Sequence, residues 1–184
     1  MREARNKGLT VPIVLMGYYN PMLAYGEEES IRDAAAAGAN GFIVVDLPPS
    51  EAHSFVGSCR KYKMAFVPLV APTTEESRLK SISEVADGFI YCVSVTGVTG
   101  NTNATQSSSQ DGLQSFLATV RKYSGDIPLA LGFGITDRDA FLRVAPHVNA
   151  VVVGSRIIVC IREAFEQKQD VSAAVLNLIQ NIIN

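Results

Sequence analysis

Short apolar runs alternate with longer amphipathic stretches along the whole chain. The runs are rich in β-branched and other apolar residues on both faces, which is typical of strands buried in a parallel sheet. Six of them are expected to be strands: Val11–Gly17, Gly41–Asp46, Ala65–Val70, Gly88–Ser94, Ile127–Leu131 and Ala150–Val153. The intervening stretches repeat apolar residues at helical spacing, as in Leu113, Phe116, Leu117 and Val120. This alternation predicts an α/β fold with right-handed crossovers.

The first eight residues are typical of the end of a helix, because Gly8 stands where a helix is often closed by a glycine. A closed (β/α)8 TIM barrel needs eight strands and typically ~250 residues. Six strands in 184 residues after a helix end are compatible with one partial TIM-barrel domain, residues 1–184, that carries only strands three to eight and their helices. Unpaired strand edges are then expected at Val11–Gly17 and Ala150–Val153. An open doubly wound sheet also fits six strands.

Composition excludes several classes of protein. The chain is 47% hydrophobic, yet its longest apolar stretches are far too short to span a bilayer, so no membrane partner is expected. Sixteen Lys and Arg against eighteen Asp and Glu, without a basic run, argue against a nucleic-acid partner. The three cysteines, Cys59, Cys92 and Cys160, lie in apolar segments. They predict buried thiols in a reducing compartment, hence a cytoplasmic protein.

Two glycine turns follow the last two expected strands. A GFGI turn occupies residues 132–135, and Gly154-Ser155-Arg156 follows Ala150–Val153. Late strands of a TIM barrel build a phosphate site from the backbone N–H groups of such loops and a helix N-terminus. Glycine suits this role because a Cβ atom would hold the backbone away from the phosphate oxygens. A plain strand-to-helix turn is the simpler alternative for each glycine taken alone.

Five motifs occur in one order along the chain: Val11–Pro21, Gly41–Pro49, Tyr91–Gly100, the GFGI turn and the Val151–Ser155 turn. Together they resemble the tryptophan synthase α subunit family, and their sequences are similar to the α half of the fused fungal enzyme. The resemblance extends from Gly8 to about Phe165. It implies a (β/α)8 lyase of tryptophan biosynthesis that cleaves indole-3-glycerol phosphate to indole and glyceraldehyde 3-phosphate. It also implies a β subunit or fused β domain that receives indole and holds pyridoxal phosphate, with no cofactor in this domain.

The resemblance also implies site residues. The substrate phosphate is expected among Gly100, Gly134, Gly154 and Ser155, and Arg156 is a further source of positive charge. The indole pocket is expected to be lined by Tyr18, Ile43, Val70 and Phe133. Tyr91 and Thr99 are expected to support the chemistry, and Asn20 and Pro48 to face the β partner.

The proton-transfer groups are expected outside this chain. The cleavage needs an acid and a base. The resemblance implies that these are a glutamate and an aspartate, and neither matches a motif of this chain. The chain is therefore expected to be an N-terminally truncated domain. No residue of this chain is therefore expected to be catalytic. Asp46 ends a strand, but a buried cap of the next helix is its expected role. His53 and His147 have no partner at metal-ligand spacing and are expected to be solvated, so no metal is expected.

Two other functions stay open. One is a different phosphate-binding barrel enzyme, although epimerases of this kind need histidine ligands and indoleglycerol-phosphate synthase needs lysines at strand ends. The other is a catalytically inactive α-like module that binds a phosphate ligand or a β partner.

Overall fold

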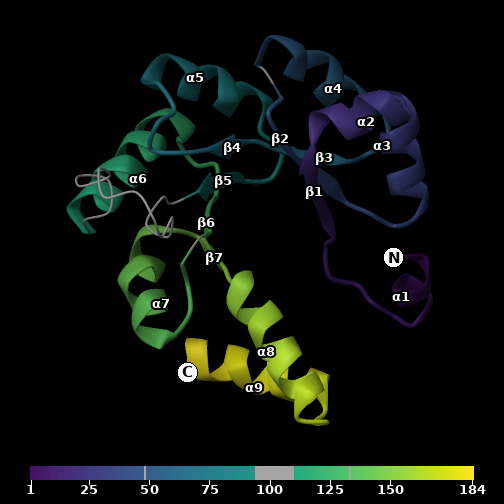
Figure 1. Cartoon of the computed structure of the whole chain (residues 1–184). Helices are drawn as coiled ribbons and strands as arrows, with labels where there is room; N and C mark the ends of the chain where they lie inside the picture. The colour runs from purple at the N-terminus through teal and green to yellow at the C-terminus, as the bar shows by residue number, and fades with distance from the viewer. Residues whose placement is uncertain (48, 94–109, 133) are drawn as a thin grey trace. The chain divides into compact units, whose positions relative to one another are not determined.

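The computed structural model describes residues 1–47, 49–93, 110–132 and 134–184 (Figure 1). The chain forms two compact units. The first comprises Met1–Val70, Thr74–Tyr91 and Tyr123–Ile127, and the second comprises Ala71–Thr73, Cys92–Lys122 and Pro128–Asn184.

Three parallel strands form the sheet of the first unit. They are β1 (Val14–Tyr18), β2 (Gly41–Val45) and β3 (Ala65–Val67), in that order. Met16 is paired with Ile43, and Ile43 with Val67, so these side chains share one face of the sheet. The unit also contains α1 (Arg2–Asn6), α2 (Tyr19–Tyr25), α3 (Glu27–Ala36), α4 (Pro49–Lys61), β4 (Leu69–Val70), α5 (Glu76–Val85) and the start of β5 (Ile90–Val93).

An aromatic cluster forms the core on the other face of this sheet. Phe55 of α4 is fully buried, and its ring makes edge contacts with Tyr19, Phe42 and Phe66 at centroid distances of 6.2, 5.9 and 5.9 Å. Such pairs add modestly to the area that they bury. The helices therefore cover the face that carries Phe42, Val44 and Phe66, and leave Ile43 on the opposite face.

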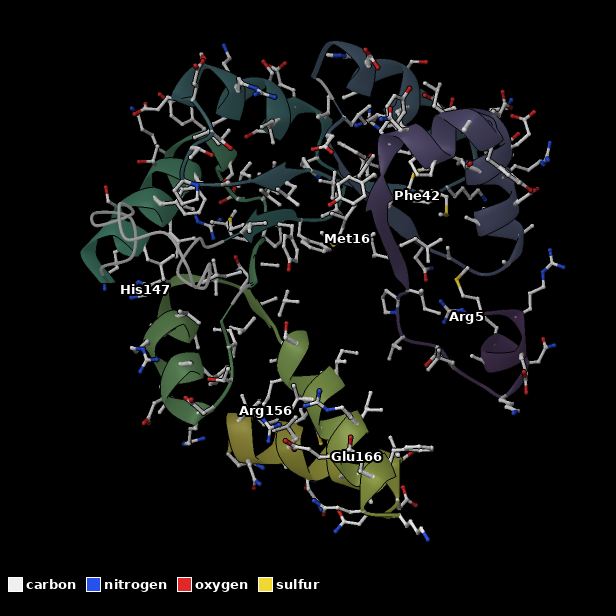
Figure 2. All side chains as sticks on the ribbon, in the orientation of Figure 1. Arg5, Met16, Phe42, His147, Arg156 and Glu166 are labelled. Atoms are coloured by element: carbon white, nitrogen blue, oxygen red, sulfur yellow. The ribbon has the colours of Figure 1, made fainter. Side chains whose placement is uncertain are left out.

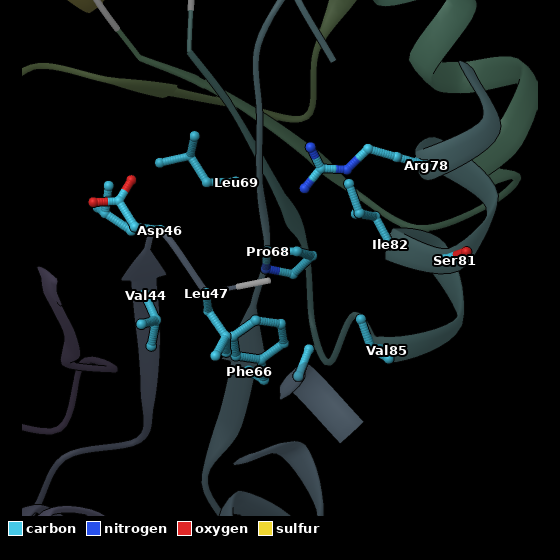
Figure 3. Close-up of a pocket in the computed structure, with 12 residues that line it drawn as sticks. Val44, Asp46, Leu47, Phe66, Pro68, Leu69, Arg78, Ser81, Ile82 and Val85 are labelled. Carbon is cyan, nitrogen blue, oxygen red and sulfur yellow. The ribbon is translucent and has the colours of Figure 1, made fainter. Parts of the chain in front are cut away.

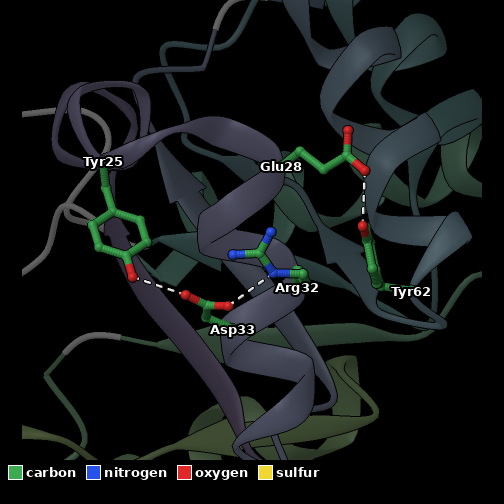
Figure 4. Close-up of polar contacts among 5 residues, drawn as sticks. All are labelled: Tyr25, Glu28, Arg32, Asp33 and Tyr62. Carbon is green, nitrogen blue, oxygen red and sulfur yellow. Dashed lines mark hydrogen bonds and ion pairs between the residues drawn. The ribbon is translucent and has the colours of Figure 1, made fainter.

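Polar contacts connect the covering helices at their surface. Asp33 of α3 accepts hydrogen bonds from the Tyr25 hydroxyl at 2.8 Å and from the Arg32 Nε at 3.0 Å (Figure 4). Glu28 accepts one from the Tyr62 hydroxyl at 2.8 Å and also pairs with Lys61. These side chains are largely exposed, so each contact stabilises the unit only slightly.

The second unit contains the parallel pair β6 (Leu129–Gly132) and β7 (Ala150–Val152). Its helices are α6 (Gln110–Ser124, of which the last two residues belong to the first unit), α7 (Arg138–Val144), α8 (Ser155–Glu166) and α9 (Val171–Ile183), with a 3-10 turn at Ala145–His147. α8 packs against α9, and the buried side chains there include Cys160, Ala164 and Ile182.

Most predicted elements are confirmed, with shifted ends. The expected strand Ala65–Val70 is divided into β3 and β4 at Pro68, because proline has no N–H for the ladder. β1 begins at Val14 rather than Val11. The predicted helix end is confirmed, since Gly8 has φ +92° and donates to Arg5 O while Leu9 donates to Ala4 O, both at 3.0 Å.

The described strands argue against a doubly wound sheet. Within each sheet they follow chain order, without the reversal of order that such a fold requires. β1 and β7 are each an edge strand of their sheet, which agrees with the strand edges predicted at Val11–Gly17 and Ala150–Val153. That residues 1–184 form a single domain stays a prediction. In the part of the chain that the structure describes, no helix is long and apolar enough to cross a membrane.

Candidate functional site

The register of β6 and β7 brings the two glycine turns together. Gly132 is the ladder partner of Val152, so the two strands reach their carboxyl ends at the same level. Gly134 follows Gly132 by two residues, and Gly154 follows Val152 by two residues. The turns therefore leave neighbouring strands side by side. This is the arrangement that the predicted phosphate site needs.

The two glycines differ in their local surroundings. Gly134 is exposed and has φ +75°, a conformation that side chains with a Cβ rarely adopt. Gly154 is the N-cap of α8, and apart from its chain neighbours no described residue has an atom within 4 Å of a Cβ placed there. Among the described residues, therefore, none blocks the surface beside Gly154.

The start of α8 supplies N–H donors. Ser155 is exposed as its first residue, and the first N–H groups of a helix have no partner within it. These groups and the helix dipole favour an anion. Arg156, labelled in Figure 2, also lies at this helix start. Its Nη1 is 3.3 Å from Glu163 Oε2 on the same helix. Part of its charge is thus already compensated.

Two of the four predicted indole-pocket residues lie on one face of the first unit's sheet. Tyr18 is paired with Val45, and Ile43 with Met16. The side chains of Tyr18 and Ile43, like those of their two ladder partners, therefore lie on the face that the helices do not cover. Tyr18 is 62% exposed, whereas Ile43 is buried. Val70 is fully buried in β4. This face offers apolar and aromatic surface at the carboxyl end of β1.

Tyr91 lies in β5, and its backbone N–H donates to Pro68 O at 2.9 Å. Its side chain is half-buried, and burial raises the pKa of its phenol. The neutral hydroxyl can therefore donate a hydrogen bond at any ordinary pH. Asn20 is exposed as the second residue of α2, directly after β1. Pro48, Thr99, Gly100 and Phe133 lie outside the described residues.

Asp46 is not the buried helix cap that the sequence suggested. Its side chain is exposed, and its backbone has φ +66°, in the left-handed region. The strand ends at Val45 and the chain turns sharply at Asp46, which directs this side chain to the surface instead of the helix start. Asp46 lines a cavity with Arg78 and Ser81 of α5. No sequence motif marks Arg78 or Ser81, so this grouping was missed.

The burial of the thiols and the exposure of the histidines are as predicted, whereas the expected absence of a metal stays a prediction. All three cysteines are free and buried, and burial raises the pKa of the Cys59 and Cys92 thiols to about 12. His53 and His147 are exposed. Across residues 1–47, 49–93, 110–132 and 134–184, no group of His, Cys, Asp or Glu side chains is placed to hold a metal ion.

Comparison with known proteins identifies the family. A family model described as "Tryptophan synthase alpha chain" matches residues 1–184. The chain is 48% identical to the tryptophan synthase of Saccharomyces cerevisiae over 183 residues, which are 99% of this chain and 25% of the yeast protein. It is 45% identical to the tryptophan synthase alpha chain of Roseiflexus castenholzii over 160 residues, which are 87% of this chain and 59% of that one. The chain thus spans less than two thirds of either relative.

Solved structures agree with this assignment. The tryptophan synthase subunit alpha of Legionella pneumophila superposes with a TM-score of 0.83 at 32% identity, over 98% of this chain and 64% of that one. The A-subunit of Pyrococcus furiosus gives 0.82 at 29% identity, over 99% and 70%. These relatives are TIM barrels, which confirms the predicted fold class. On the match over its whole length, the chain belongs to the tryptophan synthase alpha chain family.

Proposed function

We propose that the complete polypeptide is a lyase of tryptophan biosynthesis that cleaves indole-3-glycerol phosphate to indole and glyceraldehyde 3-phosphate. Family membership supports the reaction. The observation that carries the proposal is the register of β6 and β7, which sets Gly134 and Gly154 beside the open N-terminus of α8. An anionic group fits there, and the substrate carries one.

The substrate phosphate is proposed to be held by backbone N–H groups at Gly100, Gly134 and Gly154 and by the Ser155 hydroxyl. Its indole ring is proposed to lie against Tyr18, Ile43, Val70 and Phe133. The exposed ring of Tyr18 and the apolar side chain of Ile43, on one face of the sheet, support this position. Tyr91 and Thr99 are assigned supporting roles.

The reaction is a retro-aldol type cleavage. An acid protonates the indole ring carbon that bears the glycerol chain, and a base accepts protons from the indole N–H and the glycerol hydroxyl. The C–C bond then breaks, its electrons return to the ring, and the base gives one proton back to the ring nitrogen, so that indole and an aldehyde are left. We assign both proton transfers to carboxylates of the complete polypeptide that precede residue 1, because no motif of this chain supplies either group.

We further propose that indole passes to a tryptophan synthase β subunit or a fused β domain, which holds pyridoxal phosphate. Asn20 and Pro48 are proposed to face this partner. The exposure of Asn20 on α2 is compatible with such a contact. No cofactor is assigned to this domain, and the cytoplasm is the proposed location.

An indole assay tests the proposal on three samples: residues 1–184 alone, the complete polypeptide, and residues 1–184 mixed with the preceding segment. We expect indole from the second and, if the pieces assemble, from the third. The chain alone is expected to give none, because an acid and a base each contribute ~10²–10⁴ in rate. Turnover by the chain alone would overturn the assignment of the proton-transfer groups. An inactive complete polypeptide that still binds glycerol phosphate would favour the alternative, a binding module without chemistry.

A further inference from the structure

The cavity that Asp46 lines belongs to the first unit, and none of the described site residues predicted from the sequence lines it. It has a volume of about 460 Å³ and lies between β2, the β3–β4 segment and α5 (Figure 3). This volume is within the range of sites that take small molecules, ~300–1,000 Å³. It is thus large enough for a ligand of about ten heavy atoms.

One end of this cavity is apolar. Val44, Phe66, Ile82 and Val85 line it, and each of these side chains is buried. Val44 and Phe66 come from neighbouring strands, while Ile82 and Val85 come from α5. A hydrocarbon or aromatic group placed among them would leave water for an apolar surrounding, which is favourable.

The other end carries two opposite charges. Asp46 stands at the carboxyl end of β2, and Arg78 belongs to the first turn of α5. Figure 3 shows the Arg78 guanidinium directed across the cavity toward the side of Asp46, with Leu69 between them. Both side chains are exposed. A ligand can therefore reach both from solvent.

Neither charge is neutralised by a described neighbour. Within the described ranges, the Asp46 carboxylate and the Arg78 guanidinium take part in no ion pair or side-chain hydrogen bond. Other arginines of the same unit are engaged, since Arg60 pairs with Asp87 at 3.0 Å and Arg32 with Asp33 at 3.0 Å. Two unpaired, opposite charges thus flank one apolar cavity.

We propose that this cavity binds a free apolar α-amino acid. The ligand carboxylate binds Arg78, its ammonium group binds Asp46, and its side chain lies among Val44, Phe66 and Val85. Ser81, half-buried at the cavity wall, offers a further hydroxyl. Arginine suits a carboxylate because its planar N–H groups match the two oxygens.

Ligands with one charge fit less well. A simple carboxylic acid would bring a second negative charge close to Asp46, and a simple amine would bring a positive charge close to Arg78. Like charges at short range oppose binding. Glycine would satisfy both charges but would leave the apolar end filled with water. A zwitterion with an apolar side chain is the one class that uses both ends.

Titration of the ¹⁵N-labelled chain with L-leucine tests this proposal by two-dimensional NMR. We expect saturable shifts of amides at Leu69, Ser81 and Ile82. The matched ligands 4-methylpentanoate, which lacks the ammonium group, 3-methylbutylamine, which lacks the carboxylate, and glycine are each expected to bind at least about tenfold more weakly, a loss typical of one good polar or apolar contact.

Two variants remove the charges separately. Asp46→Asn and Arg78→Gln are each expected to weaken L-leucine binding by about tenfold. Asparagine tolerates the left-handed backbone as well as aspartate does, so the first variant is expected to fold normally. Lys80→Gln and Glu84→Gln change exposed charges of the same helix that do not line the cavity, and are expected to bind like the original chain.

Three results would overturn the proposal. The first is the absence of saturable shifts with L-leucine in the folded chain. The second is equal affinity for L-leucine and 4-methylpentanoate. The third is unchanged affinity in the folded Asp46→Asn and Arg78→Gln variants, with folding checked by circular dichroism. The outcome is independent of indole formation, because none of the described residues of the proposed lyase site lines this cavity.

Discussion

Asn40 and Asn149 make the same pair of hydrogen bonds at the starts of two different strands. Asn40 precedes β2, accepts the Ile13 N–H on its Oδ1 at 2.9 Å, and donates its own N–H to Ile13 O at 2.7 Å. Asn149 precedes β7 and does the same with Leu129, at 2.9 Å in both directions. In each case the asparagine Oδ1 accepts the hydrogen bond that a backbone carbonyl would accept in a strand, so the ladder is extended by one residue.

An arginine completes each of these pairs. Arg5 Nη2 donates to Asn40 Oδ1 at 2.7 Å, and Arg121 Nη2 donates to Asn149 Oδ1 at 2.9 Å. Arg5 also donates to the carbonyl oxygens of Gly38, Leu9 and Val11. Its guanidinium thus attaches α1 and the following segment to the sheet.

Replacing these asparagines should destabilise the fold unequally. Asn149→Ala leaves the N–H of the fully buried Leu129 without its acceptor, so we expect a loss of ~1–3 kcal/mol in the free energy of unfolding. Asn40→Ala affects an exposed contact, and about 1 kcal/mol or less is expected. Urea denaturation measures both. Asn177→Ala, at an exposed position of α9, is the control and should cause no loss.

Gly41 cannot carry a side chain. A Cβ at Gly41 would lie 2.5 Å from the backbone oxygen of Ala65, and a paired strand cannot move aside easily. We expect Gly41→Ala to lower the free energy of unfolding by ~2–3 kcal/mol. Gly57→Ala is the matched control. It lies within α4, where the new Cβ would meet no atom of a described residue beyond its chain neighbours and the helix backbone, so a gain of ~0.5–1 kcal/mol is expected. Similar effects of the two changes would contradict this account.

Tyr19 should make the stability depend on alkaline pH. Its hydroxyl donates to Glu27 Oε2 at 2.7 Å, and this bond, together with burial, raises the pKa of Tyr19 from 10.0 to about 12. The neutral phenol is therefore favoured in the folded state. Its contribution is fully present below pH 10 and is lost as the pH rises through about 12.

Denaturation of the original chain and of Tyr19→Phe at pH 8 and pH 11 checks this prediction. The variant should be less stable at pH 8, because it lacks the hydrogen bond, but should lose less stability on going to pH 11 than the original chain. An equal loss in both proteins would assign the alkaline sensitivity to other groups.

Gly134 should decide whether a phosphate ligand binds. We expect Gly134→Val to abolish binding of glycerol 3-phosphate in calorimetry, since the side chain would occupy the site and oppose φ +75°. Arg156→Ala should weaken binding only modestly, because that arginine already pairs with Glu163. Gly88→Val separates strain from occlusion, as Gly88 also has a positive φ, +97°, but lies outside the proposed site. Equal affinity of the original chain and the Gly134 variant would refute the site.

Local signals in the sequence predicted local structure well. The helix closed by Gly8 follows from a glycine that can take a positive φ, a property of one residue. The division of the third expected strand at Pro68 follows equally from proline chemistry, although the apolar run concealed it. The two late glycine turns follow recognisable strands, and the parallel register places them side by side.

Features that depend on distant residues were harder to predict. Asp46 was expected to be a buried cap of the next helix, but the turn at the end of β2 directs its side chain to the surface. The grouping of Asp46 with Arg78 requires that α5 pack beside the end of β2, which no short motif encodes. The asparagine pairs likewise join residues 27 and 20 positions apart.

The aromatic cluster around Phe55 has a consequence for synthesis of the protein in the cell. Its four rings belong to residues between Tyr19 and Phe66, so all of them leave the ribosome before β6 is translated. Domains and subdomains made early in translation can collapse before later segments exist. The nascent first unit can therefore bury its largest apolar groups early, which shortens the time for which they are exposed to chaperones and to other unfinished chains.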